Sequence, residues 1–381
     1  MPAETPFPRP KMASEQEELM RTLAERSMGA PFVFVPDKWY KPRGEEREAA
    51  DLAWVCNGCA VLMYLKKKVR SGRPDRATFD RLTESNFIQA RGWLRAWRAN
   101  MSTLRGANAY RSFDMACDGC EHLVILSIVD CDGAQFQEYP DLARDLGVRV
   151  CVSLPYSFME ALGKMGGSML DLLAGVQESR KVGLALPEHL ALRVVRDYQR
   201  ESWRASGAAK VWVRKDEPRF VYAATLMLGL RQLFAAPTGV DTSIPLPEDV
   251  LAQLPAARET MASVCNDLGL VDHLKLVVAL GEGIDVIVKQ SKPLGVQVVQ
   301  VAMGVFPLIH YDIVLCFARQ HRLLDALPSL NKAKEEHSRH GPDYPCPTIL
   351  FDCDSGVLFG SAYTAWPSAT SMLLERMRAG A

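Results

Sequence analysis

Residues 45–69 read EEREAADLAWVCNGCAVLMYLKKKV, and the fold expected for the chain depends on how this stretch is interpreted. The segment follows an amphipathic helical pattern over its whole length. The helix is expected to end before Gly72 and Pro74. The pattern therefore predicts one long helix over 45–69.

Helical patterns continue on both sides of this segment, and the breaks between them carry Pro or Gly. A short helix is expected over 14–27, where Ser14 and Glu17 form a capping-box pattern, and a terminal helix over 368–378. The other expected helices cover 76–83, 85–103, 106–129, 139–147, 155–180, 187–205, 218–235, 247–268, 271–290 and 294–325. Extended signals are few, at 32–35, 211–213 and 348–351.

The predicted fold is therefore all-α, with two helical lobes that clamp a basic groove and an extended arm at each end. Pro, Gly, Thr and Ser cluster at 237–247, which favours a lobe boundary there. The predicted division is an N-terminal arm at 1–30, an N-terminal lobe at 31–240, a C-terminal lobe at 241–340 and a C-terminal arm at 341–381.

Composition narrows the class of protein. The 381 residues include 45 basic and 45 acidic side chains, so the formal net charge is zero, which speaks against a polybasic tail protein and an acidic disordered activator. A hydrophobic share of 48% and a charged share of 24% are typical of a soluble globular protein. Gln297 and Gln300 interrupt the longest weakly polar run, so no membrane span is expected. The first residues lack a signal-peptide core, and the ten cysteines are expected to be reduced thiols of a cytosolic protein.

The neutral total conceals a separation of charge. Residues 66–111 carry twelve Lys or Arg against three Asp or Glu, a local charge of +9. Residues 112–147 carry eight acids against one base, a local charge of −7. We expect the acidic segment to face away from the basic groove.

Arginines recur at helical spacing within and beyond the basic segment. The first ridge is Arg91, Arg95, Arg98 and Arg105; the second is Arg193, Arg196, Arg200 and Arg204, followed by Lys210, Arg214, Lys215 and Arg219. Like charges along one face repel, and regularly spaced phosphates would neutralise them. Two interpretations stay open: a groove for a polyanion, or solvated helix faces whose Arg stems cover apolar surface. The interleaved Trp93, Trp97, Tyr198, Trp203 and Trp212 could stack on bases, although core packing is the commoner role.

Catalytic and metal motifs are weak. Cys56 and Cys59, with Cys117 and Cys120, form two Cys-x-x-Cys pairs that could hold zinc, but both pairs fall inside predicted helices and could equally be buried small residues. The Asp-x-Asp pairs at 130–132 and 352–354 favour turn or capping roles. The phosphate-loop motif and the His-Glu-x-x-His motif are both absent from the sequence. We therefore predict a chain that is not an enzyme, with no catalytic residues, no metal site and no cofactor.

Four segments resemble, in their order, the core of the nucleoproteins of non-segmented negative-strand RNA viruses (mononegaviruses). They read LRVVRDYQRESW at 192–203, PRFVYAATLMLGLRQL at 218–233, LGLVDHLKLVVALGEGID at 268–285 and VAMGV at 301–305. The size is nearer to the compact nucleoproteins of mymonaviruses and bornaviruses. The resemblance implies two helical lobes around single-stranded RNA, terminal arms that dock onto neighbouring protomers, and an RNA contact at Arg193.

The function expected at this point is that of a viral nucleoprotein, which encapsidates single-stranded genomic RNA without sequence preference and polymerises into a helical nucleocapsid. Its expected partners are RNA, further copies of itself and a viral polymerase or phosphoprotein, with no membrane. Its expected location is the virion and the host cytoplasm, with the nucleus left open. Two alternatives remain: the coat subunit of a filamentous RNA virus, and an all-α metal-binding protein or enzyme that uses the two cysteine pairs.

Overall fold

The computed structural model describes residues 14–28, 32–40, 46–56, 58–68, 75–108, 112–165, 167–205, 294–302, 310–318, 348–352, 358–361 and 369–379. The chain divides into two units: unit 1 comprises Met1–Tyr198 and Thr370–Ala381, and unit 2 comprises Gln199–Ala369. The chain therefore leaves unit 1, forms unit 2 and returns to unit 1 for its last helix. The predicted lobe boundaries fall outside the described residues and stay predictions.

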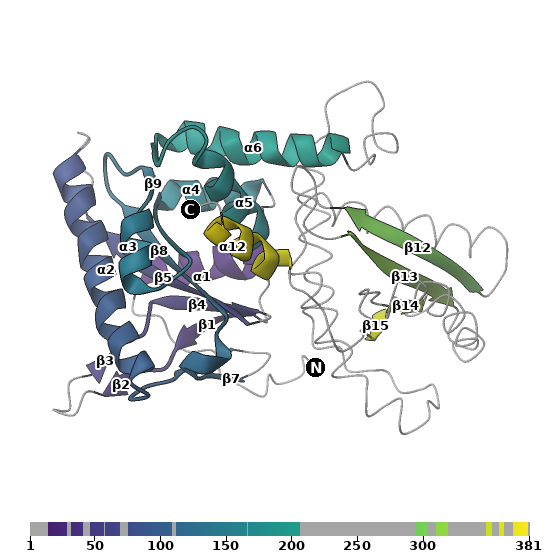
Figure 1. The fold of residues 1–381 in the computed structure, drawn as a ribbon, viewed down its shortest axis with the longest axis horizontal. Helices are drawn as coiled ribbons and strands as arrows, with labels where there is room; N and C mark the ends of the chain where they lie inside the picture. Colours follow the sequence, from purple (N-terminus) through teal and green to yellow (C-terminus); the bar gives the residue numbers. More distant parts are fainter. Residues whose placement is uncertain are drawn as a thin grey trace. The chain divides into compact units, whose positions relative to one another are not determined.

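Unit 1 is built on a mixed sheet of nine strands (Figure 1). In spatial order the strands are β11 (Ala185–Leu186), β9 (Phe136–Glu138), β10 (Val150–Pro155), β8 (His122–Asp130), β5 (Cys59–Lys67), β4 (Leu52–Cys56), β1 (Val33–Pro36), β6 (Leu104–Ala107) and β7 (Ser112–Met115). The central strands β5, β8 and β10 are parallel to one another. On the two flanks, β4 pairs antiparallel with β5, and β9 pairs antiparallel with β10. A separate pair joins β2 (Trp39–Tyr40) to β3 (Glu46–Arg47).

The helix predicted over 45–69 is wrong, because most of this stretch forms the β4–β5 hairpin. Leu52 pairs with Met63 and Cys56 with Cys59. The residues between the two strands are Asn57 and Gly58, a dipeptide that favours hairpin turns, and Gly58 has the left-handed φ of 75° that suits it. Both strands are buried along nearly all of their length, so they read as continuous apolar runs without the alternation of an exposed strand.

The sheet overturns the predicted all-α fold, since unit 1 is an α/β structure. The helix predicted over 106–129 is also wrong, because β7, a short 3-10 helix (η2, Cys117–Gly119) and β8 occupy most of it. In unit 2, the residues predicted as a helix over 294–325 include β12 (Leu294–Ala302) and β13 (His310–Ala318). Together with β14 (Thr348–Asp352) and β15 (Leu358–Ser361) they form a sheet of four strands, in the order β12, β13, β14 and β15. Strand β14 confirms the strand predicted at 348–351.

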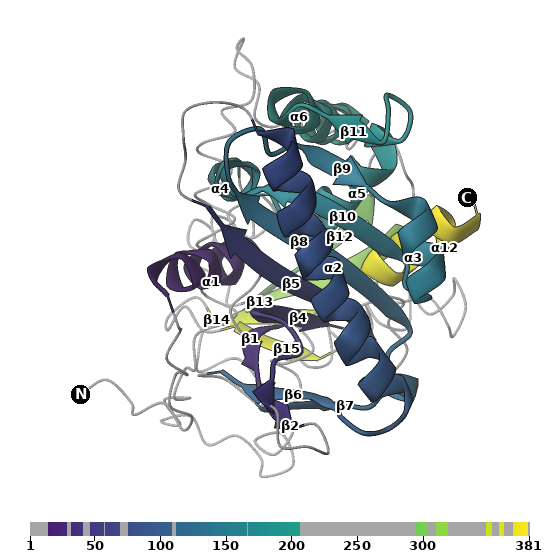
Figure 2. The same cartoon turned by 90° about the vertical axis from the view of Figure 1, so that its left-hand side faces the viewer.

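Helices cover both faces of the nine-stranded sheet. Helices α2 (Arg76–Arg98) and α3 (Pro140–Leu146) pack on one face, where α2 crosses the central strands (Figure 2). Helices α1 (Glu15–Met28), α4 (Tyr156–Lys164), α5 (Met169–Ser179) and α12 (Ala369–Ala379) lie on the other side (Figure 1). Helix α6 (Glu188–Ala205) comes after α5 in the chain. The strands between these layers bury most of their side chains, as expected for parallel strands with helices on both sides.

Several predicted helices are confirmed, and their caps explain why. The Ser14 N–H donates to Glu17 Oε2 and the Glu17 N–H donates to Ser14 Oγ, each at 3.2 Å, which is the predicted capping box of α1. Asp75 caps α2 by accepting the Thr78 N–H. The predictions at 139–147, 187–205 and 368–378 correspond to α3, α6 and α12. No described helix is long and apolar enough to cross a membrane.

Two helical glycines provide a matched test of how closely the layers pack. A Cβ added at Gly175 in α5 would lie 2.5 Å from Val195 Cγ2 of α6, whereas a Cβ at Gly92 in α2 would meet no atom within 4 Å. We expect Gly175→Ala to lower the free energy of unfolding by about 1–3 kcal/mol through overpacking. Gly92→Ala should raise it by about 0.5–1 kcal/mol, because alanine is the better helix former.

Urea denaturation followed by circular dichroism measures both effects. Equal shifts of the two variants in the same direction would contradict the close approach of α5 and α6.

Candidate functional site

The first predicted arginine ridge is not one continuous helix face. Arg91, Arg95 and Arg98 are exposed on α2, but the helix ends at Arg98 and Arg105 lies on β6. Arg105 lies 3.5 Å from the Asp37 carboxylate, and Arg98 donates to the main-chain oxygens of Leu146 and Gly147. Among the described residues, Arg91 and Arg95 have no carboxylate within 4 Å.

The second predicted ridge is described only in part. Arg193 and Arg196 are exposed on α6, and Arg193 lies 3.6 Å from the Asp197 carboxylate of the next turn. The side chains of Arg200 and Arg204 lie outside the described residues, as do Lys210, Arg214, Lys215 and Arg219. The assignment of these six to an RNA groove therefore stays a prediction.

The described aromatic residues of the ridges belong to the core. Trp93 and Trp97 stack on each other at 4.8 Å and are at most 2% exposed, and Tyr198 is also buried. These three side chains cannot stack on bases at the surface. Trp203 and Trp212 have side chains outside the described residues.

The sheet separates the two cysteine pairs. Cys59 Sγ lies 3.1 Å from Ser371 Oγ of α12, whereas Cys117 and Cys120 pack against the core that α2 and α3 cover on the opposite face. Burial raises the pKa of the Cys120 thiol to about 12, which disfavours the thiolate that binds metal. Within the described residues, no group of three or more His, Cys, Asp or Glu side chains could hold a metal ion.

A cluster of charged side chains lies at the carboxyl ends of the parallel strands. We call it the strand-end cluster and define it as Glu17, Asp51, Lys66, Lys67 and Asp130. Strands β5 and β8 end in register, with Lys67 opposite Asp130. The Asp130 carboxylate is 3.7 Å from Lys67 Nζ and accepts a hydrogen bond of 3.3 Å from Gln16 of α1. In sheets with parallel strands, ligands bind in the crevice outside these ends.

Asp51 is the most perturbed carboxyl group in this cluster. Its Oδ2 accepts the Leu65 N–H at 2.6 Å. Burial raises the pKa of Asp51 from 3.8 to about 6, the Leu65 hydrogen bond and the Lys66 charge lower it, and Glu17 and Glu48 raise it. A partly buried carboxyl group with a raised pKa that interacts with a cation is a common feature of catalytic sites.

The three consecutive lysines at the end of β5 differ in their partners. Lys67 pairs with Asp130, and Lys68 Nζ lies 3.4 Å from Asp75 and donates to Thr78 Oγ1 at 2.8 Å. Lys66 has no carboxylate within 4 Å among the described residues, although its charge acts on Asp51. Lys66 is therefore the lysine of this run that is available to bind an anion.

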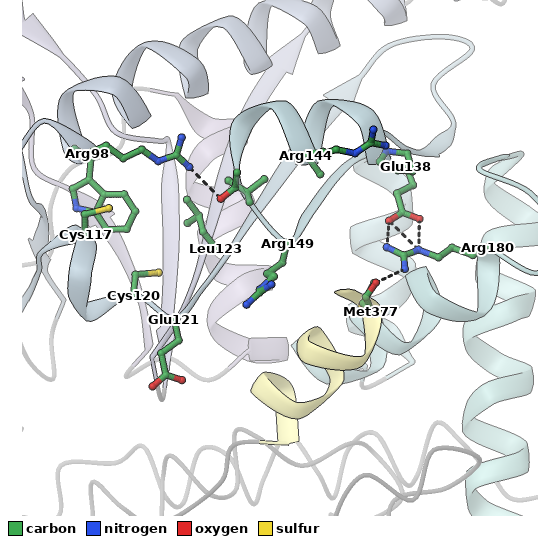
Figure 3. Close-up of a pocket in the computed structure, with 15 residues that line it drawn as sticks. Arg98, Cys117, Cys120, Glu121, Leu123, Glu138, Arg144, Arg149, Arg180 and Met377 are labelled. Atoms are coloured by element: carbon green, nitrogen blue, oxygen red, sulfur yellow. Dashed lines mark hydrogen bonds and ion pairs between the residues drawn. The ribbon is translucent and has the colours of Figure 1, made fainter. Parts of the chain in front are cut away.

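A second feature is a pocket of about 810 Å³ between α2 and α3, shown in Figure 3. Arg98, Arg144, Arg149 and Arg180 line it, together with Glu121 and Glu138. Arg180 holds the buried Glu138 carboxylate through both oxygens, with distances of 2.7–3.2 Å. Leu123 and Arg149 lie at the amino ends of β8 and β10, so this pocket is at the opposite end of the parallel strands from the strand-end cluster.

The predicted separation of acidic and basic segments does not hold. Asp130 lies beside Lys67, and Glu121 and Glu138 line the same pocket as Arg98. Acids of the segment 112–147 therefore mix with the bases that they were expected to avoid. This mixture counts against the single basic groove.

Comparison with known proteins identifies no relative: no protein-family model, no curated protein and no solved structure matches the chain. The sheet contradicts the all-α fold and the helical lobe that the resemblance implied for unit 1. Most of the segments that carry the resemblance to nucleoproteins lie outside the described residues, so that resemblance stays a prediction. The interpretation of the site depends on the geometry of unit 1.

No motif or spacing in the sequence marks Asp51 or the pocket arginines Arg144, Arg149 and Arg180 as site residues. Asp51 stands directly before the apolar run of β4, and an isolated acid at that boundary was the one available signal. The pocket arginines share no spacing: Arg144 lies on α3, Arg149 directly before β10 and Arg180 directly after α5, and the fold brings them together.

The raised pKa of Asp51 predicts a cost in stability above about pH 6. The carboxyl binds its proton more tightly in the folded state (pKa about 6) than in the unfolded state (3.8), so stability is lost as pH rises between these values. The loss is roughly 3 kcal/mol. We expect Asp51→Asn to be more stable than the wild type at pH 8 by on the order of 1–3 kcal/mol, and equally stable near pH 4.

Urea midpoints at the two pH values measure this difference. Asp145→Asn, at an exposed position on α3, is the matched control and should change neither midpoint. A destabilised Asp51→Asn at pH 8 would contradict the assignment.

Proposed function

We propose that unit 1 binds single-stranded nucleic acid and cleaves its phosphodiester backbone at the strand-end cluster. The observation that carries the proposal is Asp51, a half-buried carboxyl group with a pKa of about 6 that feels the charge of Lys66 at the carboxyl ends of parallel strands. A general base is most effective when its pKa lies near the working pH. The proposal replaces the encapsidating role and keeps nucleic acid as the expected partner.

In the proposed reaction, Asp51 accepts a proton from the attacking water. The water oxygen forms a bond to phosphorus, and the bond from phosphorus to the leaving sugar oxygen breaks. Lys66 binds the phosphate oxygens and stabilises the charge that develops on them. The leaving oxygen takes its proton from solvent.

Helix α2 supplies a path for the rest of the strand. Its first turn is attached to residues that follow the cluster in the chain, since Lys68 donates to Thr78 and the Asp75 N–H donates to Asp132 O. Along its exposed face, Arg81, Arg91 and Arg95 have no carboxylate within 4 Å among the described residues. Arginines at these positions would contact successive phosphates without reading sequence.

Cleavage of end-labelled single-stranded RNA and DNA oligonucleotides tests the chemistry. We expect Asp51→Asn and Lys66→Met to lower the rate by about 10²-fold or more. The wild-type rate should rise with pH and reach half its maximum near pH 6, where Asp51 loses its proton. Asp145→Asn and Lys164→Met, both at exposed positions, are the matched controls and should cleave like the wild type.

Each assay is run with EDTA and with Mg²⁺. Cleavage in EDTA supports Asp51 as a base that acts without a metal ion. Cleavage only with Mg²⁺ would make Asp51 and Glu17 metal ligands, since one or two carboxylates with phosphate oxygens suffice for this ion. Absence of cleavage in both conditions, or full activity of Asp51→Asn, overturns the proposal.

Binding is tested apart from cleavage, with Asp51→Asn as the background. Replacing Arg91 and Arg95 by Gln removes two proposed phosphate contacts. The slope of log affinity against log salt should become shallower by about 1.4, at about 0.7 for each contact with a single strand. Fluorescence anisotropy with a labelled oligonucleotide measures the slope, with Lys164→Gln as the control; an unchanged slope would exclude α2 from the binding path.

A further inference from the structure

The second Cys-x-x-Cys pair lies at a pocket where small molecules can reach it. Cys117 and Cys120 both line the pocket of about 810 Å³ between α2 and α3, and both are partly exposed. The other four described cysteines are buried: Cys56, Cys59, Cys131 and Cys151. Among the cysteines whose side chains the structure describes, this pair is therefore the one that is open to chemistry with a molecule from solution.

The backbone holds the two residues at the ends of one turn. Cys117 begins the 3-10 helix η2, and the Cys120 N–H donates to Cys117 O at 3.3 Å. A turn closed by this bond brings its first and fourth Cα atoms within about 7 Å of each other. A disulfide joins Cα atoms about 4.4–6.8 Å apart. In Figure 3 both sulfur atoms point from the turn in the same direction. The pair can therefore form a disulfide with little movement of the backbone.

The two thiols have different surroundings. Cys120 Sγ donates to His122 O at 3.3 Å, which holds its proton in place. Burial, followed by the charge of Cys117, raises the pKa of the Cys120 thiol to about 12, and an effect of Cys117 on this pKa requires the two sulfur atoms to be close. Thiol–disulfide exchange needs an accessible thiol that attacks first and a second thiol that resolves the intermediate. Cys117 suits the first role and Cys120 the second.

One arginine of the same pocket is open to a carboxylate. Arg98 donates to the main-chain oxygens of Leu146 and Gly147, and among the described residues no carboxylate lies within 4 Å of it. The other pocket arginines each have a carboxylate partner: Arg144 pairs with Asp141, Arg149 with Glu375 and Arg180 with Glu138. Figure 3 shows the Glu121 carboxylate pointing away from Arg98. A substrate with a carboxylate would therefore bind at Arg98.

We propose that Cys117 and Cys120 form a redox-active dithiol that reduces small disulfides bearing carboxylates. The Cys117 thiolate attacks one substrate sulfur and forms a mixed disulfide, and the other substrate sulfur leaves as a thiolate that takes a proton from solvent. Cys120 then loses its proton to solvent and attacks the Cys117 sulfur, which releases the second thiolate. The pair loses two electrons and the substrate gains them, and an excess of the small thiol reverses both steps.

The inference is independent of the proposed cleavage. Cys120 comes shortly before His122, the first residue of β8, whereas the strand-end cluster lies at the other end of this strand. Either proposal can therefore fail while the other stands.

Thiol mapping of the reduced full chain tests the inference. Oxidised glutathione, a small disulfide with carboxylates, is added, free thiols are alkylated at intervals, and peptides are analysed by mass spectrometry. We expect a disulfide between Cys117 and Cys120 to form about tenfold or more faster than any of the buried described cysteines reacts. Excess reduced glutathione should restore both thiols. Faster oxidation of a buried described cysteine, or no disulfide in this pair, would overturn the inference.

Single variants test the order of attack. Cys120→Ser removes the resolving thiol, so one glutathione should stay on Cys117 as a mixed disulfide. Cys117→Ser should lower the reaction rate at Cys120 by about tenfold or more, because that thiol holds its proton. Cys131→Ala, which removes a buried thiol outside the pocket, is the matched control and should react like the wild type. A Cys120→Ser chain that takes up no glutathione overturns the role of Cys117.

A charge variant tests the substrate class. Arg98→Gln should slow the reaction with oxidised glutathione several-fold and leave the reaction with the uncharged bis(hydroxyethyl) disulfide unchanged. Arg193→Gln, at an exposed position of α6 outside the pocket, is the matched control and should react like the wild type with both compounds. Equal slowing with both disulfides, or no slowing with either, overturns the carboxylate contact at Arg98.

Discussion

The pairing of β5 with β8 is the interaction on which the rest of unit 1 depends. Nine register pairs run from Cys59 opposite His122 to Lys67 opposite Asp130. Both strands are buried, so their main-chain polar groups have no access to water and must bond to each other. A parallel pair needs a crossover connection, and α2 provides it over one face of the sheet. The position of α2, and of the arginines on it, follows from this single pairing.

The sheet built on this pairing also separates groups of reactive side chains from one another. Cys59 of β5 lies against α12 on one face of the sheet, and Cys120, which comes shortly before β8, packs on the α2 face. Parallel strands also have two distinct ends. The carboxyl ends of β5 and β8 gather the lysines and Asp51, and the amino ends of β8 and β10 open into the arginine-lined pocket. Two sites of different character are therefore built on one set of strands.

Asp51 shows how stability and function can oppose each other at one residue. Burial disfavours its charge, and Glu17 and Glu48 add to that cost. The Leu65 N–H and Lys66 compensate only in part, since the pKa stays raised at about 6. A proposed catalytic role gives a physical reason for a chain to retain such a group.

Local signals in the sequence were sufficient for elements whose ends are marked by side chains. The Ser14–Glu17 box, Pro140 at the start of α3 and Gly147 after it all act within a few residues, and the corresponding helices were predicted. The apolar runs at 52–67 and 122–130 lacked such marks, apart from Asn57–Gly58. A strand buried on both faces has no polar side from which its period can be read.

By itself the sequence determined the capped helices, the strand at 348–351 and the presence of a basic segment with exposed arginines. Only the tertiary structure decided that the central apolar runs are strands, because β5 and β8 depend on each other as partners 63 residues apart in the chain, as for Cys59 and His122. It also decided the candidate sites. The charges of Lys66 and Glu17 act on Asp51 across the ends of β5, α1 and β4, and the pocket arginines come together from α2, α3 and the residues next to α5 and β10. The spacing of these residues along the chain does not predict that they come together, since their positions depend on strand pairing across the sheet.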